Sequence, residues 1–125
     1  MNPPTTHRHT WNTYTRSWSE VDPAKRRRLL EQAVHPQCVY ADPHVQVEGH
    51  LALSEYMSEF QKNFRDSAFV VTDYSEHHGQ SLAAWNLVDG SGAVLARGTS
   101  FAAYDDIGLL RKMSGFFAPF APASA

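Results

Sequence analysis

An aspartate that directly precedes a proline is the sharpest candidate for chemistry in this sequence. Asp42 follows a short run that ends in Tyr40, and Pro43 breaks that run. A carboxylate at the end of a strand, beside an apolar pocket, loses hydration of its charged form and can act as a general base. The alternative is that Asp42 only caps a turn whose backbone Pro43 restricts. The residue types leave both hypotheses open.

A tyrosine within an aromatic stripe is the second candidate. Trp11, Tyr14 and Trp18 recur at spacings of three and four, which places them on one face of a helix. A phenol in a dry pocket can donate a hydrogen bond to a developing oxyanion. An aromatic stripe is equally typical of a hydrophobic core, so both interpretations of Tyr14 stay open.

The chain has seven histidines, which raises the question of a metal site. His77 and His78 are adjacent, so on a strand they point to opposite faces and cannot ligate one ion. No histidine or cysteine spacing matches a zinc signature, and we expect no metal. His44 lies two residues after Asp42 and is the best-placed proton partner, since imidazole exchanges protons near neutral pH. The alternative is a solvated loop histidine.

Large apolar side chains are expected to surround these groups. Alternate residues of a strand share a face, so Trp85 lies with Leu87, and Met113 lies with Phe117. Apolar walls with few polar groups are typical of a small-molecule site, although the same side chains could simply fill a core. The predicted substrate-binding residues are Trp18, Tyr40, His44, Tyr56, Met57, Phe60, Trp85, Met113 and Phe117.

The elements that position these residues change type along the chain. Asp22 followed by Pro23 predicts a second helix, because aspartate caps free amides and proline fits a first turn; Pro36 predicts its end. Helical spacing predicts a third helix over about residues 51–64. Residues rich in β-branched and aromatic types then predict antiparallel strands, separated by short turns, at 69–77, 82–88, 93–104 and 109–117.

Helices followed by strands favour an α+β fold, in which helices cover one face of a curved sheet. We expect a single domain over residues 10–117, with flexible tails at 1–9 and 118–125. The three consecutive arginines Arg26, Arg27 and Arg28 are predicted to form a solvated helix face.

Composition excludes several classes of protein. With 125 residues, 42% of them hydrophobic, the chain is long enough for one folded domain. Eleven Lys and Arg against 13 Asp and Glu give a net charge of -2, which argues against a nucleic-acid binder. No apolar run approaches the length of a membrane helix, and the first ten residues lack the apolar centre of a signal peptide. Cys38 is the single cysteine, so we expect a cytoplasmic protein without a disulfide.

An ordered set of marks, from Thr10 to Phe117, resembles the nuclear transport factor 2-like superfamily. That group includes ketosteroid isomerases, SnoaL-type polyketide cyclases and limonene epoxide hydrolases. The resemblance implies a cone: a curved mixed or antiparallel β-sheet wrapped around N-terminal helices and enclosing one pocket. The marks are Tyr14, Trp18 and Asp22; Tyr40-Ala41-Asp42-Pro43; Gly49 before a helix; Trp85; and Gly98, Tyr104, Gly108 and Gly115-Phe116-Phe117.

The resemblance to the isomerases also implies roles for individual residues. Asp42 matches their general base, and Tyr14 matches the tyrosine that holds the oxyanion. Their second donor, a protonated aspartate eight residues before the glycine of the last turn, is replaced here by Ser100, counted back from Gly108. A hydroxyl is a weaker donor, which argues against a faithful steroid isomerase. The Asp–Arg–Asp arrangement of the epoxide hydrolases is not evident either.

Two functions are therefore carried forward. In the first, a SnoaL-like domain binds a small apolar or carbonyl-bearing molecule and, without a cofactor, moves a proton next to a carbonyl in an isomerisation, cyclisation or dehydration. Asp42, Tyr14 and Ser100 would be its catalytic residues. In the second, the domain is a non-catalytic ligand carrier or a dimeric interaction module. Neither nucleic acid nor a membrane is expected as a partner.

We also expect a homodimer that forms through the outer face of the sheet. If Ser100 and Met113 point inward, then Phe101, Leu110 and Phe116 point outward by strand alternation. Such an apolar patch exceeds what a soluble monomer usually exposes.

Overall fold

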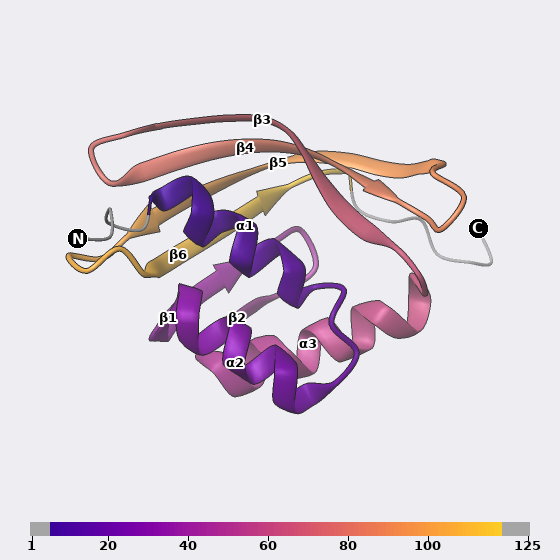
Figure 1. Cartoon of the computed structure of the whole chain (residues 1–125), viewed down its shortest axis with the longest axis horizontal. Helices are drawn as coiled ribbons and strands as arrows, with labels where there is room; N and C mark the ends of the chain where they lie inside the picture. Colours follow the sequence, from indigo (N-terminus) through magenta and orange to yellow (C-terminus); the bar gives the residue numbers. More distant parts are fainter. Residues whose placement is uncertain (1–5, 119–125) are drawn as a thin grey trace, which may run out of the picture.

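In the computed structural model of the protein, residues 6–118 are described and form three helices and six strands (Figure 1). The first half of this part of the chain holds all three helices and two of the strands, and four further strands follow. In chain order the elements are α1 (His7–Ser17), α2 (Pro23–Ala33), β1 (Val34–Ala41), β2 (Gln46–Glu48), α3 (His50–Asn63), β3 (Ala68–His77), β4 (Gln80–Val88), β5 (Val94–Tyr104) and β6 (Leu110–Phe116).

The strands form one mixed sheet in the order β2-β1-β6-β5-β4-β3. Pairing is antiparallel except between β1 and β6, which run parallel. The sheet order ends in β2 and β3, so the sheet does not close on itself. Figure 1 shows β3 to β6 curving over α1, with α2 and α3 on the same side of the sheet. The predicted α+β class, a curved mixed sheet around N-terminal helices, is confirmed.

Both N-terminal helices begin at side-chain caps. The Asp22 carboxylate accepts a hydrogen bond from the Ala24 amide at 3.0 Å, and Pro23 occupies the first turn, as predicted. Thr6 caps α1 by accepting from the His9 amide, so the helix begins at His7. Residues 7–9 therefore belong to α1 rather than to an N-terminal tail. The remaining tail predictions, for residues 1–5 and 119–125, lie outside the described residues.

The expected outward position of Leu110 is wrong. Leu110 is fully buried, whereas Phe116 is 63% exposed. The pairing of β5 with β6 shifts between Tyr104–Leu110 and Ala103–Lys112, which leaves Arg111 as one extra residue in β6. A bulge of this kind breaks strict alternation. It turns Leu110 toward the same buried side as Met113.

The prediction that all three consecutive arginines face solvent is wrong for Arg26. Arg26 is 1% exposed, whereas Arg27 and Arg28 are exposed. Arg26 precedes the buried Leu30 by four residues, so it lies on the inner face of α2. Its guanidinium donates to the Glu20 carbonyl at 2.8 and 3.0 Å and to side chains of α3, namely Ser54, Ser58 and Gln61.

Arg26 therefore connects α2 to α3 and to the preceding loop. Burial lowers the pKa of Arg26, and the nearby negative charges of Glu20 and Asp22 oppose that effect.

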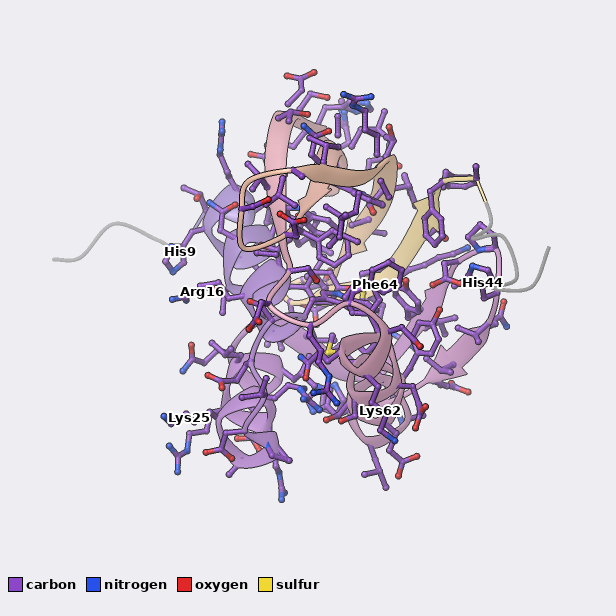
Figure 2. The ribbon with its side chains drawn as sticks, turned by 90° about the vertical axis from the view of Figure 1, so that its right-hand side faces the viewer. His9, Arg16, Lys25, His44, Lys62 and Phe64 are labelled. Carbon is purple, nitrogen blue, oxygen red and sulfur yellow. The ribbon has the colours of Figure 1, made fainter. Side chains whose placement is uncertain are left out.

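Charged side chains cover the outside of the helical layer. Figure 2 shows Arg16, Lys25 and Lys62, one from each helix, on the outer surface, and all three are exposed. The buried core lies between the helices and the concave face of the sheet. None of the helices within residues 6–118 is long and apolar enough to span a membrane.

Candidate functional site

Four hydrogen bonds hold the carboxylate of Asp42. Its Oδ2 accepts from the hydroxyls of Tyr40, at 2.6 Å, and Tyr56, at 2.8 Å. Its Oδ1 accepts from the backbone amides of His44, at 2.8 Å, and Val45, at 3.2 Å. One oxygen therefore caps the turn between β1 and β2, and the other faces two tyrosine hydroxyls. The turn-capping hypothesis for Asp42 therefore holds for Oδ1, while Oδ2 faces two hydroxyls that the sequence did not predict as its partners.

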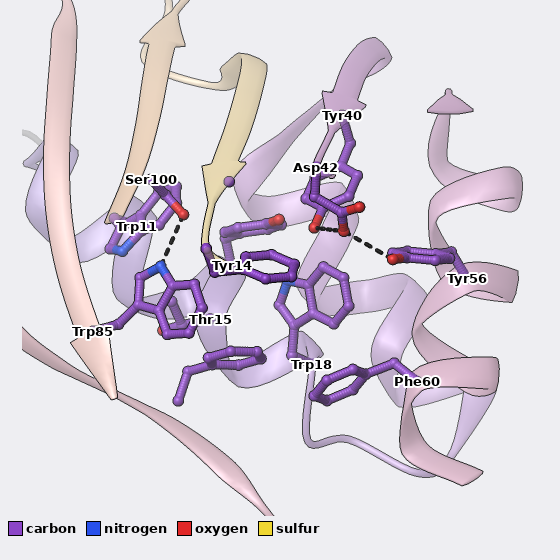
Figure 3. A pocket seen from close by; sticks show the side chains of 13 residues that line it. Trp11, Tyr14, Thr15, Trp18, Tyr40, Asp42, Tyr56, Phe60, Trp85 and Ser100 are labelled. Carbon is purple, nitrogen blue, oxygen red and sulfur yellow. Dashed lines mark hydrogen bonds between the residues drawn. The ribbon is translucent and has the colours of Figure 1, made fainter. Parts of the chain in front are cut away.

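Local structure explains why Tyr56 reaches a residue at the end of β1. Gly49 has a φ of +86°, a region that favours glycine, and its amide donates to the Cys38 carbonyl of β1 at 2.9 Å. The chain thereby turns directly from β2 into α3. Tyr56 lies two turns into α3, and its hydroxyl meets the Asp42 carboxylate (Figure 3).

A mostly aromatic cavity lies beside Asp42. Its volume is about 50 Å³ and it is partly open to solvent. Figure 3 shows Asp42, Tyr40 and Tyr56 on one side of it, and Trp11, Trp85 and Ser100 on the other. The lining residues are Trp11, Tyr14, Thr15, Trp18, Tyr40, Asp42, Tyr56, Phe60, Phe69, Trp85, Ser100, Gly115 and Phe117.

Trp18 is the aromatic centre of the wall formed by the helices. Its ring contacts Tyr14 edge-on at 6.5 Å between centroids, and it also packs against Tyr40, Tyr56, Phe60 and Phe69 at 5.3–5.9 Å. Edge-to-face ring pairs at these separations stabilise the fold beyond what the burial of their apolar surface contributes.

The tyrosines of the site stay protonated at neutral pH. Burial raises the pKa of Tyr14, against a smaller opposing hydrogen bond with the Trp18 side chain. Burial likewise raises the pKa of Tyr40 and of Tyr56, and for Tyr56 the hydrogen bond to Asp42 adds to the effect. Tyr40 and Tyr56 donate to the Asp42 carboxylate, and the nearby negative charge of Asp42 also raises the pKa of Tyr14.

Ser100 and Trp85 form the opposite wall. The Trp85 Nε1–H donates to Ser100 Oγ at 3.0 Å, so the serine oxygen is an acceptor and its own hydrogen remains for a second partner. Phe117 packs against Trp85 with its centroid at 5.8 Å and against the ring of His44 at 5.9 Å. His44 is exposed and contributes its backbone amide to Asp42.

Three residues predicted from the sequence to bind substrate do not line the cavity. Met57 and Met113 are buried in the hydrophobic core instead. Met57 lies one residue after Tyr56 on α3, and the rotation of about 100° per residue turns it away from Asp42. His44 lies behind Phe117 on the solvent side.

Four lining residues were not predicted: Trp11, Thr15, Phe69 and Gly115. A signal existed for two of them. Trp11 belongs to the same helical stripe as Tyr14 and Trp18, and Gly115 shares strand alternation with Phe117. Within residues 6–118, no three His, Cys, Asp or Glu side chains are close enough together to hold a metal ion.

The sequence matches no protein-family model and no curated protein. The fold, in contrast, is similar to many solved structures. A SnoaL-like family protein from Agrobacterium tumefaciens str. C58, proposed to be an isomerase, is 26% identical with a TM-score of 0.83, over 90% of this chain and 97% of that one.

Two more distant structures show the fold alone. A nuclear transport factor 2-like protein of unknown function from Cytophaga hutchinsonii is 12% identical with a TM-score of 0.72, over 95% of this chain and 96% of that one. A protein from Sinorhizobium meliloti, proposed to be a polyketide cyclase, is 14% identical with a TM-score of 0.68, over 85% and 92%. The chain therefore has the nuclear transport factor 2-like fold, in the form found in SnoaL-like proteins.

Proposed function

We propose that the protein binds a small carbonyl-bearing molecule in the aromatic cavity and moves a proton next to the carbonyl, with Asp42 as the general base. The observation that carries this proposal is the position of Asp42 Oδ2, which lies at the cavity within 2.6 and 2.8 Å of two tyrosine hydroxyls. The similar structures described as a SnoaL-like isomerase and a polyketide cyclase support this class of reaction.

The reaction is a balanced proton transfer. Asp42 Oδ2 takes a proton from the carbon next to the carbonyl, and the electron pair of that C–H bond moves toward the carbonyl to form an enolate. The neutral Tyr14 hydroxyl donates a hydrogen bond to the enolate oxygen. Asp42 then returns the proton to the same carbon or to a conjugated one. Either Tyr40 or Tyr56 must release Oδ2 while the proton is held there.

The cavity limits the size of the molecule. A volume of about 50 Å³ holds roughly three to five water molecules, since one water needs about 10–15 Å³. A single small ring or a short branched chain fits this space, with part of the molecule extending toward solvent. A polycyclic substrate would require the aromatic walls to move apart.

The direct test is exchange of the α-hydrogens of cyclopentanone in D2O, followed by proton NMR. The protein should accelerate exchange over buffer, and Asp42→Asn should lower the enzymatic rate by about 100-fold or more, the usual contribution of a general base. Asp73→Asn removes the same charge from an exposed position of β3 and should leave the rate unchanged. An Asp42→Asn variant as fast as the parent would exclude Asp42 as the base.

A non-catalytic ligand carrier is the second candidate. The observation that favours it is that both oxygens of Asp42 already accept two hydrogen bonds each in the ligand-free fold. Such a carboxylate can serve as an anchor that ties the β1–β2 turn to α3. Saturable binding of cyclopentanone without any acceleration of exchange would support this candidate.

A further inference from the structure

Gly115 occupies a buried position of β6 where the fold itself does not require a glycine. Four other glycines have a positive φ, which favours this residue type: Gly49, Gly79, Gly92 and Gly108. Gly115 instead lies within a regular strand and is paired with Ser100 of β5. A Cβ at residue 115 would have its three nearest atoms at 3.6–3.8 Å, which is ordinary van der Waals contact. Since glycine weakens a strand relative to alanine, the missing side chain calls for another explanation.

The space that a side chain at Gly115 would occupy belongs to the cavity. Its three nearest atoms would be Phe117 Cε1 at 3.6 Å, Asp42 Cβ at 3.7 Å and Ser100 Oγ at 3.8 Å. All three residues line the cavity, as Gly115 itself does. The glycine therefore leaves room inside the cavity rather than in the hydrophobic core. A glycine within a strand often marks a place where a ligand approaches the backbone closely.

The register of the sheet places Gly115 between Asp42 and Ser100. On one side, Ala41 of β1 is paired with Ser114, so the next residue, Asp42, stands beside Gly115. On the other side, Ser100 of β5 is the direct partner of Gly115. Figure 3 shows Asp42 and Ser100 on either side of β6, the yellow strand. A molecule lying on the bare backbone of Gly115 would therefore have the carboxylate at one edge and the serine hydroxyl at the other.

We infer that Gly115 sets the size of the molecule that the cavity accepts, because that molecule lies directly on the β6 backbone at this residue. This inference rests on the proposed function, and it narrows the substrate class to ketones of about the size of a five-membered ring. A methyl group at residue 115 would displace the ring, since non-bonded carbon atoms stay about 3.5–4.0 Å apart. In a cavity of about 50 Å³, the remaining space suits a smaller ketone such as acetone.

The test compares cyclopentanone with acetone, which has the same carbonyl and fewer carbons, in the parent and in Gly115→Ala. Titrations followed by the ¹⁵N–H signals of the folded protein give the two affinities. The variant should lower the ratio of cyclopentanone affinity to acetone affinity by about 10-fold or more, the scale on which a pocket discriminates one methylene group. Gly90→Ala is the matched control: it adds the same methyl group in the turn after β4, outside the cavity, where the Cβ would lie 3.8 Å from Asp66. The ratio should not change in this control.

Two further measurements separate a change of cavity size from a defect in folding. The midpoint of urea unfolding of Gly115→Ala should equal or exceed that of the parent, because alanine suits a strand better than glycine and its Cβ would meet ordinary contacts. In the parent, without any substitution, an Hα proton of Gly115 should show a nuclear Overhauser effect to the ring protons of bound cyclopentanone.

The outcomes separate this inference from the proposed function. An affinity ratio that Gly115→Ala leaves unchanged, or a Gly115 Hα without a nuclear Overhauser effect at saturating ketone, overturns the size limit while exchange catalysed by Asp42 still stands. A marked loss of stability in Gly115→Ala shows that packing itself requires the glycine, and it also overturns the inference. A lowered ratio together with exchange that does not depend on Asp42 supports the size limit and overturns the catalysis. Absence of any saturable ketone binding overturns both.

Discussion

The indole of Trp85 lies directly over Gly98 on the neighbouring strand. The two residues are paired in register between β4 and β5, and a Cβ at residue 98 would lie 2.3 Å from Trp85 Cζ2. It would also lie 2.8 Å from the carbonyl oxygen of Phe116 on β6. The missing side chain at Gly98 therefore lets the indole lie flat against the sheet. From there its Nε1 reaches Ser100 and its ring forms one wall of the cavity.

Gly98→Ala should destabilise the protein by about 1–3 kcal/mol, the usual cost of overpacking a buried site. The reason is that both the indole and the β6 backbone must shift. Denaturant unfolding measures the loss, and the tryptophan fluorescence of the folded protein should change with it because Trp85 moves. Gly90→Ala is the control, since its Cβ would be in ordinary contact at 3.8 Å. Equal stability of both variants would show that Trp85 relaxes without cost.

Trp18→Ala should cost about 3–5 kcal/mol, as large buried aromatics do. Its ring contacts Tyr14, Tyr40, Tyr56, Phe60 and Phe69, so the truncation leaves a hole at the centre of the helical wall. Chemical denaturation compares this variant with Tyr14→Phe, which keeps the ring in place and removes only a hydroxyl. A Tyr14→Phe variant as unstable as Trp18→Ala would assign the Tyr14 hydroxyl to the core and remove it from the site.

Local signals predicted the elements well, and long-range pairing explains what they missed. Asp22 and Pro23 specify a helix start by their own chemistry, and the turn cap at Asp42 follows from the Asp-Pro pair in the same way, whereas its contact with Tyr56 was not predicted. The burial of Arg26 depends on Ser58, 32 residues later, and no local pattern reports that contact. The inward turn of Leu110 likewise depends on a register shift between two strands, which alternation within β6 cannot reveal.

The buried tyrosines predict a loss of stability at alkaline pH. Their pKa values in the folded protein are raised by burial, while an unfolded tyrosine ionises near pH 10. Above about pH 10 the unfolded chain therefore binds fewer protons than the folded one, so the free energy of unfolding falls as pH rises. The stabilisation is fully present below about pH 10, and each buried tyrosine contributes a slope of about 1.4 kcal/mol per pH unit above it.

Tyr40→Phe should make the free energy of unfolding fall less steeply above pH 10, by roughly the contribution of one tyrosine. The reason is that the Tyr40 hydroxyl is buried and donates to Asp42. Urea unfolding at pH 9, 10 and 11 gives the slopes of the parent and the variant. Identical slopes would mean that Tyr40 ionises in the folded protein as easily as in the unfolded chain.

Asp42→Asn should lower stability by about 1–3 kcal/mol, because hydrogen bonds to a charged acceptor are the stronger ones. The amide can still cap the turn through its oxygen, while its NH2 group replaces the acceptor that faces Tyr40 and Tyr56. A double-mutant cycle with Tyr56→Phe should show a coupling of about 0.5–3 kcal/mol, typical of contacting residues. Additive effects would indicate that the contact between Tyr56 and Asp42 carries no free energy.

We propose that two copies of the chain associate through the outer face of the sheet. Leu82, 51% exposed, pairs with Phe101 across β4 and β5, and Phe116, 63% exposed, lies on the same face by alternation along β6. Contiguous apolar side chains on a sheet face are typical of an interface between subunits.

Sedimentation of the parent at micromolar concentration should give a dimer, and Phe116→Glu should give a monomer. Ile107→Glu is the control, since Ile107 is 81% exposed in the turn before β6 rather than on a strand of the sheet, and it should leave the dimer intact. A monomeric parent, or a Phe116→Glu variant that still sediments as a dimer, would remove this face as the interface.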